Sequence, residues 1–361
     1  MDEGVLVLLQ GGVFAISGET GEELWSYYGH GRSLIGNVSS DGEYVVLYDE
    51  EESRTVLLRS STGEIVGEFD VDLSEIDYTR TMSPDHLAAA LAGVSGDTWV
   101  VRREDSVDSY DLATGDQAWT ASDVPSCPDV GQVDSLTVQS DVVVAATTCF
   151  EQPEDRDSVV HVQGWDFTSE LVGLDPDTGE ELWRVEHSVG RSPFDSLERT
   201  IEPRPGGFVY IDFHYPYPPV GYSVLDIEAQ EAIHLETQSL LWTSPEGSHL
   251  GLWDLETGEY QVQDRSGNVE RTLELDTLSM SDDMVTDGLR VGLEGGVLYL
   301  TNEVADASAS EGFARFEGFE DSATFTWDRE ESLSVTEALS VPGAVAVAYR
   351  AGDTRGVMGL R

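Results

Sequence analysis

Lysine is absent from this chain, so arginine supplies all 19 of its basic side chains against 70 acidic ones. The resulting net charge of −51 disfavours nucleic acid and anionic membrane surfaces as partners, because both would be repelled. The favoured interpretation of the acidic excess is a solvated surface. The alternative is that it binds basic proteins or, weakly, cations. The chain also lacks a convincing amphipathic helix and any apolar run long enough to span or target a membrane.

Cysteine is nearly absent, with Cys127 and Cys149 as the only two. Their spacing matches no zinc motif, and no pair of the seven histidines has ligand spacing on one strand. The two cysteines can form a disulfide or remain free thiols. The sequence also lacks a nucleophile elbow, a phosphate-binding loop and a dinucleotide fingerprint, so no metal, cofactor or catalytic residue is assigned.

A short motif recurs along the chain. "AISGETGEELWSY" near the N-terminus and "LDPDTGEELWRV" at residues 174–185 both predict a strand, a tight turn and a strand that carries a Trp. Gly21, Gly115 and Gly179 supply the positive φ that such turns need. Related strand–turn–strand motifs, called corners, occur at Thr62-Gly63 and Ser266-Gly267. Degenerate copies occur around Gln230 and before Trp327. Two further strand-like runs precede most corners, so each unit is predicted to be four antiparallel strands, A to D.

The corner resembles the repeat of the quinoprotein-type (PQQ-like) β-propeller family, which includes quinone-dependent alcohol dehydrogenases and non-catalytic propellers of the BamB type. This resemblance implies an all-β propeller of four-stranded blades formed by one domain, residues 1–361. Eight blades are favoured and seven are the alternative. The chain opens on strands B, C and D and ends on A, B and C, which suggests that an upstream signal or anchor was removed. Trp25, Trp119 and Trp183 are expected to be buried against neighbouring blades.

The favoured function is a non-catalytic, extracytoplasmic scaffold that binds a protein or peptide, with no cofactor. The alternative is a quinone-dependent oxidoreductase with an atypical site, since the adjacent cysteines expected beside that cofactor are missing. Because consecutive strands of a propeller blade alternate in direction, the long B–C and D–A connections are expected on one face. Cys127 precedes strand A of the fourth blade and Cys149 ends its strand B, so both are expected on that face. A Cys127–Cys149 disulfide is therefore favoured over two free thiols, and it predicts an extracytoplasmic protein. The candidate binding face lies on that same side, at the fourth and fifth blades, with the disulfide at its edge, and comprises Trp165, Phe167, Phe213, His214, Tyr215 and Tyr217.

Overall fold

A computed structural model covers residues 1–361, and its described part is built of β-strands and turns, with no α-helix in it. The described residues are 4–9, 11–17, 20–29, 34–39, 42–49, 52, 54–70, 92–103, 105–122, 124–126, 130–139, 141–150, 167–187, 198–214, 222–235, 238–254, 256–274, 288–301, 311–319, 322–328, 333–341, 344–351 and 354–360. For some of these, among them Phe167, Phe213 and His214, only the backbone is described.

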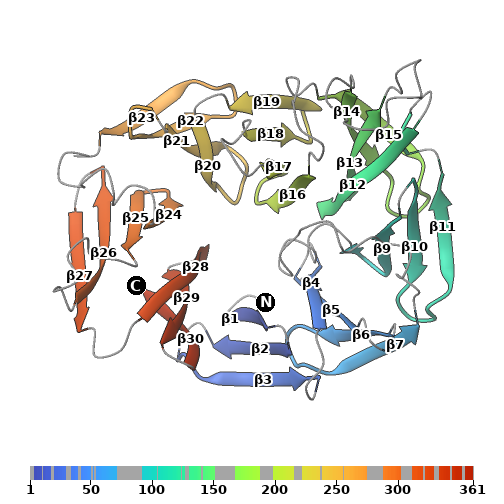
Figure 1. Cartoon of the computed structure of the whole chain (residues 1–361), viewed down its shortest axis with the longest axis horizontal. Coiled ribbons are helices and arrows are strands. Elements are labelled where there is room, and N and C mark those ends of the chain that lie inside the picture. Colours follow the sequence, from blue (N-terminus) through green and yellow to red (C-terminus); the bar gives the residue numbers. More distant parts are fainter. Residues whose placement is uncertain are drawn as a thin grey trace, which may run out of the picture. The chain divides into compact units, whose positions relative to one another are not determined.

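The chain forms two compact units, residues 1–234 and 235–361. The first unit holds five sheets of consecutive antiparallel strands, numbered here in chain order (Figure 1). Their strands are β1 (Gly4–Leu9), β2 (Gly12–Ser17) and β3 (Glu23–Tyr28); β4 (Leu34–Val38), β5 (Tyr44–Asp49), β6 (Arg54–Arg59) and β7 (Ile65–Asp70); β8 (Ala92–Ser95), β9 (Thr98–Arg102), β10 (Val107–Asp111) and β11 (Gln117–Ala121); β12 (Val130–Gln139), β13 (Val142–Phe150), β14 (Phe167–Leu174) and β15 (Glu181–Glu186); β16 (Glu198–Arg204), β17 (Phe208–His214), β18 (Tyr222–Asp226) and β19 (Glu231–Leu235).

The second unit holds the sixth, seventh and eighth sheets. Their strands are β20 (Gln238–Thr243), β21 (His249–Asp254), β22 (Glu259–Asp264) and β23 (Val269–Glu274); β24 (Gly288–Leu293), β25 (Gly296–Thr301), β26 (Glu311–Gly318) and β27 (Ser322–Asp328); β28 (Leu333–Val341), β29 (Ala344–Ala351) and β30 (Thr354–Leu360). The first sheet therefore has strands B, C and D, and the eighth has A, B and C, as the sequence predicted.

The β-propeller fold class predicted from the repeat is confirmed, since the described strands form six four-stranded and two three-stranded antiparallel sheets. The blade number of a closed propeller, eight or seven, stays a prediction, as does the single domain. The third sheet is described from Ala92 onward, where β8 begins. The degenerate corner at Gln230 is present, and Gln230 adopts a φ of 54°.

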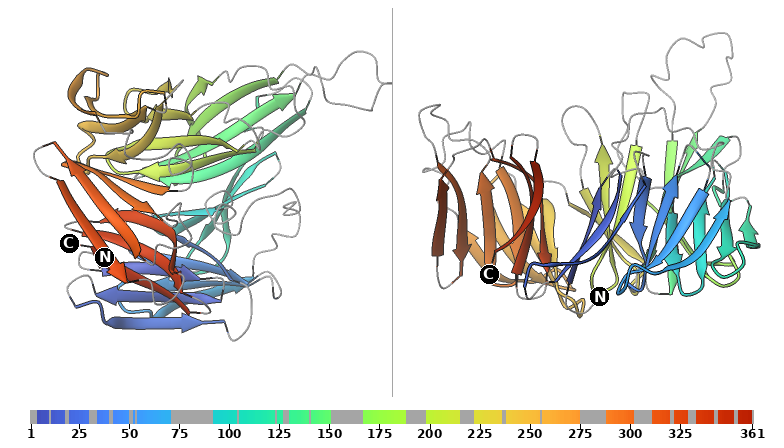
Figure 2. Two further views of the ribbon diagram at one scale, coloured as in Figure 1. Left: turned by 60° about the vertical axis from the view of Figure 1, so that its left-hand side comes forward. Right: turned by 90° about the horizontal axis from the view of Figure 1, so that it is seen from below.

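Consecutive sheets within each unit pack face to face through apolar side chains, and Figure 2 shows the strands of the first unit standing beside one another. Burial of these faces is the main stabilising contribution, because it removes apolar surface from water. The clusters between sheets include Val45 and Leu47 with Val13 for the first and second; Val46 and Leu57 with Trp99 for the second and third; Val100 and Val107 with Leu136 for the third and fourth; Val144 and Leu171 with Ile211 for the fourth and fifth; and Tyr260 with Val297 for the sixth and seventh.

The corner between strands C and D follows from its Asp and Gly residues. In the fourth sheet, Asp175 Oδ1 accepts hydrogen bonds from the backbone N–H groups of Asp177 and Thr178 at 3.0 and 2.9 Å, and from the Thr178 hydroxyl at 2.9 Å. Gly179 then turns the chain at a φ of 72° and donates its N–H to the Asp175 carbonyl at 2.8 Å. Asp111 forms the same contacts in the third sheet. An Asp side chain that caps the turn and a Gly that tolerates it therefore fix the hairpin.

Candidate functional site

The long connections of the first unit all join strand D to A or strand B to C. Because adjacent strands alternate in direction, these connections leave the sheets at the same end, called here the loop-bearing end. In the fourth and fifth sheets they are residues 151–166 and 215–221, between strands B and C, and 187–197, between the two sheets. The opposite end has only short turns, such as 140–141 and 205–207. The strand ends that carry the long connections are the base of the candidate site.

The base is held by a continuous core between the fourth and fifth sheets. Val144, Leu171 and Trp183 of the fourth sheet pack against Ile201 and Ile211 of the fifth, and four of these five side chains are fully buried. A close-packed core of this kind fixes the two sheets relative to each other. The connections 151–166 and 215–221 therefore start from strand pairs whose spacing is set.

Arg184 on β15 links three segments below the loop-bearing end. Its guanidinium forms ion pairs with Glu170 of β14 and with Glu181, the latter at 2.7 Å, and donates to the Val124 carbonyl at 3.0 Å. Burial opposes the charge of Arg184, but its bonds to the two carboxylates outweigh this and raise its pKa. Val124 lies in the connection that leads from the third sheet to β12. Arg184 therefore ties that connection to the fourth sheet.

His187, Ser223 and His234 join the fourth and fifth sheets. His187 Nε2 lies 2.9 Å from Ser223 Oγ, which also lies 3.3 Å from His234 Nδ1. A Ser beside a His is the pair needed for nucleophilic catalysis, but Ser223 is fully buried and no substrate can reach its hydroxyl. The cluster acts as a polar link between the two sheets.

A second polar link joins the third and fourth sheets. Arg102 of β9 donates to the backbone carbonyls of Val133 and Asp134 at 2.8 and 2.7 Å, where a bulge shifts the register of β12. The Asp134 carboxylate accepts hydrogen bonds from Gln132 at 2.7 Å and from Thr148 at 2.6 Å. These contacts occupy the buried carboxylate within the protein and hold the start of β12 in place. No pattern in the sequence predicted Arg102, Asp134, Arg184 or the histidine pair.

The predicted binding residues are only partly within the described structure. Trp165, Tyr215 and Tyr217 lie outside the described residues. Phe167 begins β14 opposite Phe150. Phe213 and His214 end β17, opposite Arg199 and Glu198 of β16. All three therefore stand at the loop-bearing end, on the two sheets named from the sequence, and a common aromatic surface remains a prediction.

The predicted cysteine pair is described at one member only. Cys149 near the end of β13 is 4 % exposed and lies opposite Gly131 of β12, while Cys127 lies outside the described residues. Because only three residues separate Cys127 from Gly131, the Cα atoms of Cys127 and Gly131 can be at most about 14 Å apart. The disulfide stays a prediction.

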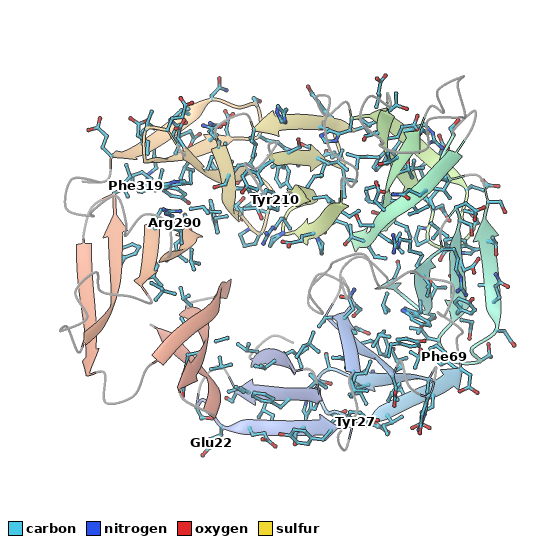
Figure 3. All side chains as sticks on the ribbon, in the orientation of Figure 1. Glu22, Tyr27, Phe69, Tyr210, Arg290 and Phe319 are labelled. Atoms are coloured by element: carbon cyan, nitrogen blue, oxygen red, sulfur yellow. The ribbon has the colours of Figure 1, made fainter. Side chains whose placement is uncertain are left out.

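The corner tryptophans reach the next sheet in chain order. Trp25 donates its indole N–H to the Ser60 carbonyl and Trp119 donates to the Pro176 carbonyl, both at 2.9 Å. Each acceptor stands three residues before the corner glycine of the next sheet, and a Cβ on that glycine would come within 2.7 Å of Trp25 or 2.5 Å of Trp119. Trp183 is 9 % exposed, covers Gly173 of its own sheet and also packs in the core shared with the fifth sheet. Phe69 takes over the stacking in the second sheet and lies between the second and third sheets (Figure 3).

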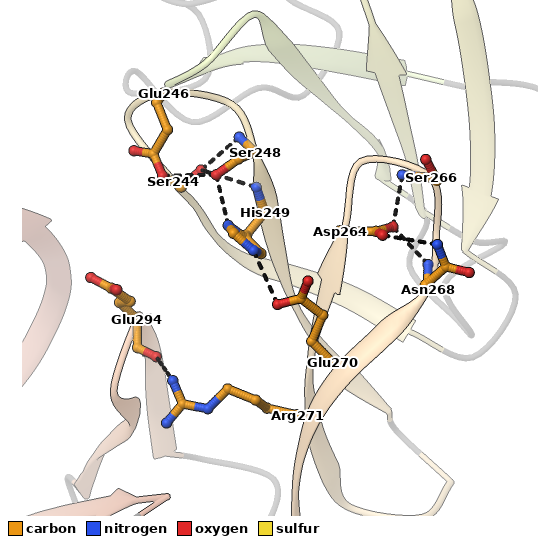
Figure 4. A network of polar contacts seen from close by, with 10 residues as sticks. All are labelled: Ser244, Glu246, Ser248, His249, Asp264, Ser266, Asn268, Glu270, Arg271 and Glu294. Carbon is orange, nitrogen blue, oxygen red and sulfur yellow. Dashed lines mark hydrogen bonds and ion pairs between the residues drawn. The ribbon is translucent and has the colours of Figure 1, made fainter.

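A surface network in the sixth sheet has the residue types of a catalytic triad (Figure 4). Ser248 Oγ lies 2.7 Å from His249 Nδ1, and His249 Nε2 lies 3.2 Å from Glu270 Oε2. The backbone N–H groups of Ser248 and His249 both donate to Ser244 Oγ, and that of Gly247 donates to the Ser244 carbonyl. These groups are thus not available to stabilise an oxyanion, so the network closes a turn. Across the described residues no group of three or more acidic, His or Cys side chains could hold a metal ion.

The comparisons with known proteins agree with the repeat. The family model "Outer membrane protein assembly factor BamB" matches residues 9–271, so the chain belongs to this family of PQQ-like propellers. BamB from Moraxella catarrhalis has a similar structure, with a TM-score of 0.56 and 12 % identity over 100 % of this chain and 92 % of that one. Dihydro-heme d1 dehydrogenase NirN gives a TM-score of 0.51 and 11 % identity over 100 % and 73 %. No curated protein matches the sequence.

At these identities the solved structures show a shared fold alone. The family supports, at a coarse level, a propeller that works through protein contacts. Within the described segments there is no helix with the length and apolarity needed to cross a membrane.

Proposed function

We propose that this protein is a non-catalytic, extracytoplasmic propeller that binds a protein or peptide at the loop-bearing end of its fourth and fifth sheets. The observation that carries the proposal is the pairing of two long B–C connections, 151–166 and 215–221, on sheets locked together by one core. Connections on a rigid base lose less entropy on binding than isolated loops. Membership of the BamB family supports a role based on protein contacts.

The proposed contact residues are Trp165, Phe167, Phe213, His214, Tyr215 and Tyr217. Aromatic side chains suit this role, because a few of them supply most of the binding energy in protein interfaces. The test is a double variant, Tyr215→Ser with Tyr217→Ser, used to capture partners from a native extract. Tyr28→Ser is the matched control, since Tyr28 is 52 % exposed on β3, in the first sheet. Loss of a captured protein in the double variant alone is expected. Equal capture by all forms, with an intact fold, would move the site elsewhere.

A Cys127–Cys149 disulfide is part of the proposal, because it would brace the connection before β12 against the end of β13. Alkylation under denaturing conditions, followed by mass spectrometry, tests it. Neither thiol should be modified before reduction, and both should be modified afterwards. Modification without a reductant would contradict the disulfide and remove its support for an extracytoplasmic location.

The competing enzyme hypothesis is tested separately. A quinone-dependent oxidoreductase should retain added pyrroloquinoline quinone and a divalent cation through gel filtration and show a visible chromophore. We expect no retained absorbance. A stoichiometric chromophore would overturn the non-catalytic assignment and leave the fold unaffected.

A further inference from the structure

The inner edge of the first sheet differs from that of every other sheet in the first unit. Within the described residues, β1 pairs with β2 alone. In the second to fifth sheets the equivalent B strand has an A strand on its other side, namely β4, β8, β12 or β16. Alternate N–H and C=O groups of β1 therefore point away from β2 toward an edge where the other sheets have a hydrogen-bonded strand.

Burial shows the same difference. The B strands β5, β9, β13 and β17 are buried through their centres, with Val45, Val100, Val143 and Val209 at 0 % exposure. In β1, residues 4–7 are only half-buried and Leu8 is 39 % exposed, although the strand reads "GVLVLL". An all-apolar strand that stays this accessible leaves hydrophobic surface uncovered.

The exposure of Leu8 does not come from a missing neighbour on its face of the sheet. Leu6 packs against the core shared by the first and second sheets. Leu8, two residues on, points to the same face, and Gly36 of β4 lies so close that an added Cβ would be 2.7 Å from a Leu8 methyl carbon. Leu8 therefore stays 39 % exposed despite this neighbour, on a strand that lacks the covering A strand found in the second to fifth sheets.

We propose that the free edge of β1 is a docking site for one extended, uncharged, apolar strand of a partner protein, added antiparallel to β1. The A strands of the second and third sheets show one kind of strand that fits such an edge, because β4 ("LIGNV") and β8 ("AGVS") cover β5 and β9 and carry no charge, whereas β12 and β16 include charged residues. Residues 4–17 likewise contain no charged side chain in a protein of net charge −51. The six residues of β1 match a partner strand of about 20 Å.

This site is separate from the proposed binding site at the loop-bearing end of the fourth and fifth sheets, and the two proposals are tested independently. The probe is a synthetic peptide with the sequence of residues 33–40, "SLIGNVSS", capped at both ends and added to the intact protein at millimolar concentration. Hydrogen exchange measured by mass spectrometry follows β1 and β5 in the same sample. Exchange of β1 amides is expected to slow by about tenfold with the peptide, while β5 is unchanged. A peptide with Ile35→Pro, which lacks an N–H in the centre of the strand, should not protect β1.

A protein variant completes the test. Leu8→Ser removes the exposed apolar side chain at the edge and should abolish the protection. Leu24→Ser is the matched control, since Leu24 is 54 % exposed on the outer strand β3, and protection should persist. The proposal is overturned if β1 already exchanges as slowly as β5 without peptide, because the edge would then be filled. It is also overturned if the peptide protects β5, or protects nothing.

Discussion

The indole N–H of Trp119 joins two sheets through a single hydrogen bond to the Pro176 carbonyl. Trp119→Phe keeps the stacking on Gly179 but leaves that carbonyl without its donor, so a loss of about 1 kcal/mol in unfolding free energy is expected. Urea unfolding measures it as a lower midpoint with an unchanged slope. Trp25→Phe, which removes the equivalent bond to Ser60, should cost a similar amount. No change in either variant would mean that the bond contributes nothing.

Asp175 illustrates how one carboxylate stabilises a corner. Hydrogen bonds from the Thr178 hydroxyl and the Thr178 backbone N–H lower the pKa of Asp175 below its usual range. Because the pKa is lower in the folded state, this contribution is present above the unfolded value of about 3.9 and is lost as the pH falls further. Thr178→Val should raise the pKa of Asp175 in an NMR titration. Asp111 in the unmodified third sheet is the internal control, and its pKa should not change.

Corner glycines act at the scale of the element, since each shapes a turn, and Gly63, Gly115 and Gly179 also receive a ring from the preceding sheet. Gly21 and Gly179 have nearly equal φ values of 73° and 72°, but only Gly179 lies against an indole, that of Trp119. Gly21→Ala should therefore cost roughly 1–2 kcal/mol from backbone strain alone. Gly179→Ala should cost roughly 1–3 kcal/mol more, because the added methyl collides with Trp119. Thermal or urea unfolding compares the two, and equal losses would contradict the stacking.

The strands and most corners could be predicted from sequence because their physics is local. Positive φ at glycine, an Asp that caps the turn and alternating apolar residues all act within about ten residues. The same local chemistry also occurs at Thr257-Gly258, which instead joins strands B and C of the sixth sheet. Gly67 occupies the Trp position in β7, and Phe69 replaces the ring two residues later. Such exchanges depend on the neighbouring sheet and leave no pattern in a single sequence.

The candidate site was predictable only in its location. The alternating direction of the predicted strands placed the long connections of the fourth and fifth sheets at one end, and the observed strand bounds agree with that placement. Arg102, Arg184 and the His187–Ser223 contact join residues 31 to 60 positions apart in the chain. Contacts at such separations follow from packing between sheets, so composition and spacing could not reveal them.

Net charge acts on the whole molecule. With 70 acidic and 19 basic side chains, the folded state concentrates repulsion that the unfolded chain spreads out. Salt shortens the screening length from about 10 Å at 0.1 M to about 3 Å at 1 M, so the melting temperature should rise with potassium chloride. Sucrose at equal osmolality, which does not screen charge, separates this effect from solvent exclusion. A melting temperature that does not change with salt concentration would indicate that the carboxylates are already neutralised by bound cations.

Gly67 stands in β7 where β3 and β11 carry a Trp, and this difference affects the order in which the sheets of the first unit unfold. Sheets that touch only their chain neighbours behave as a row of coupled units, in which the weakest junction opens first. The junction between the second and third sheets keeps the Phe69 ring, but no described indole donates to the Leu112 carbonyl, the acceptor equivalent to Ser60 and Pro176. Among the described residues the fourth and fifth sheets also lack an indole bond, but they share the buried His187–Ser223 contact. Under mild denaturant the first two sheets should therefore detach as a pair, and hydrogen exchange would show β1 to β7 opening together while β12 to β19 remain closed.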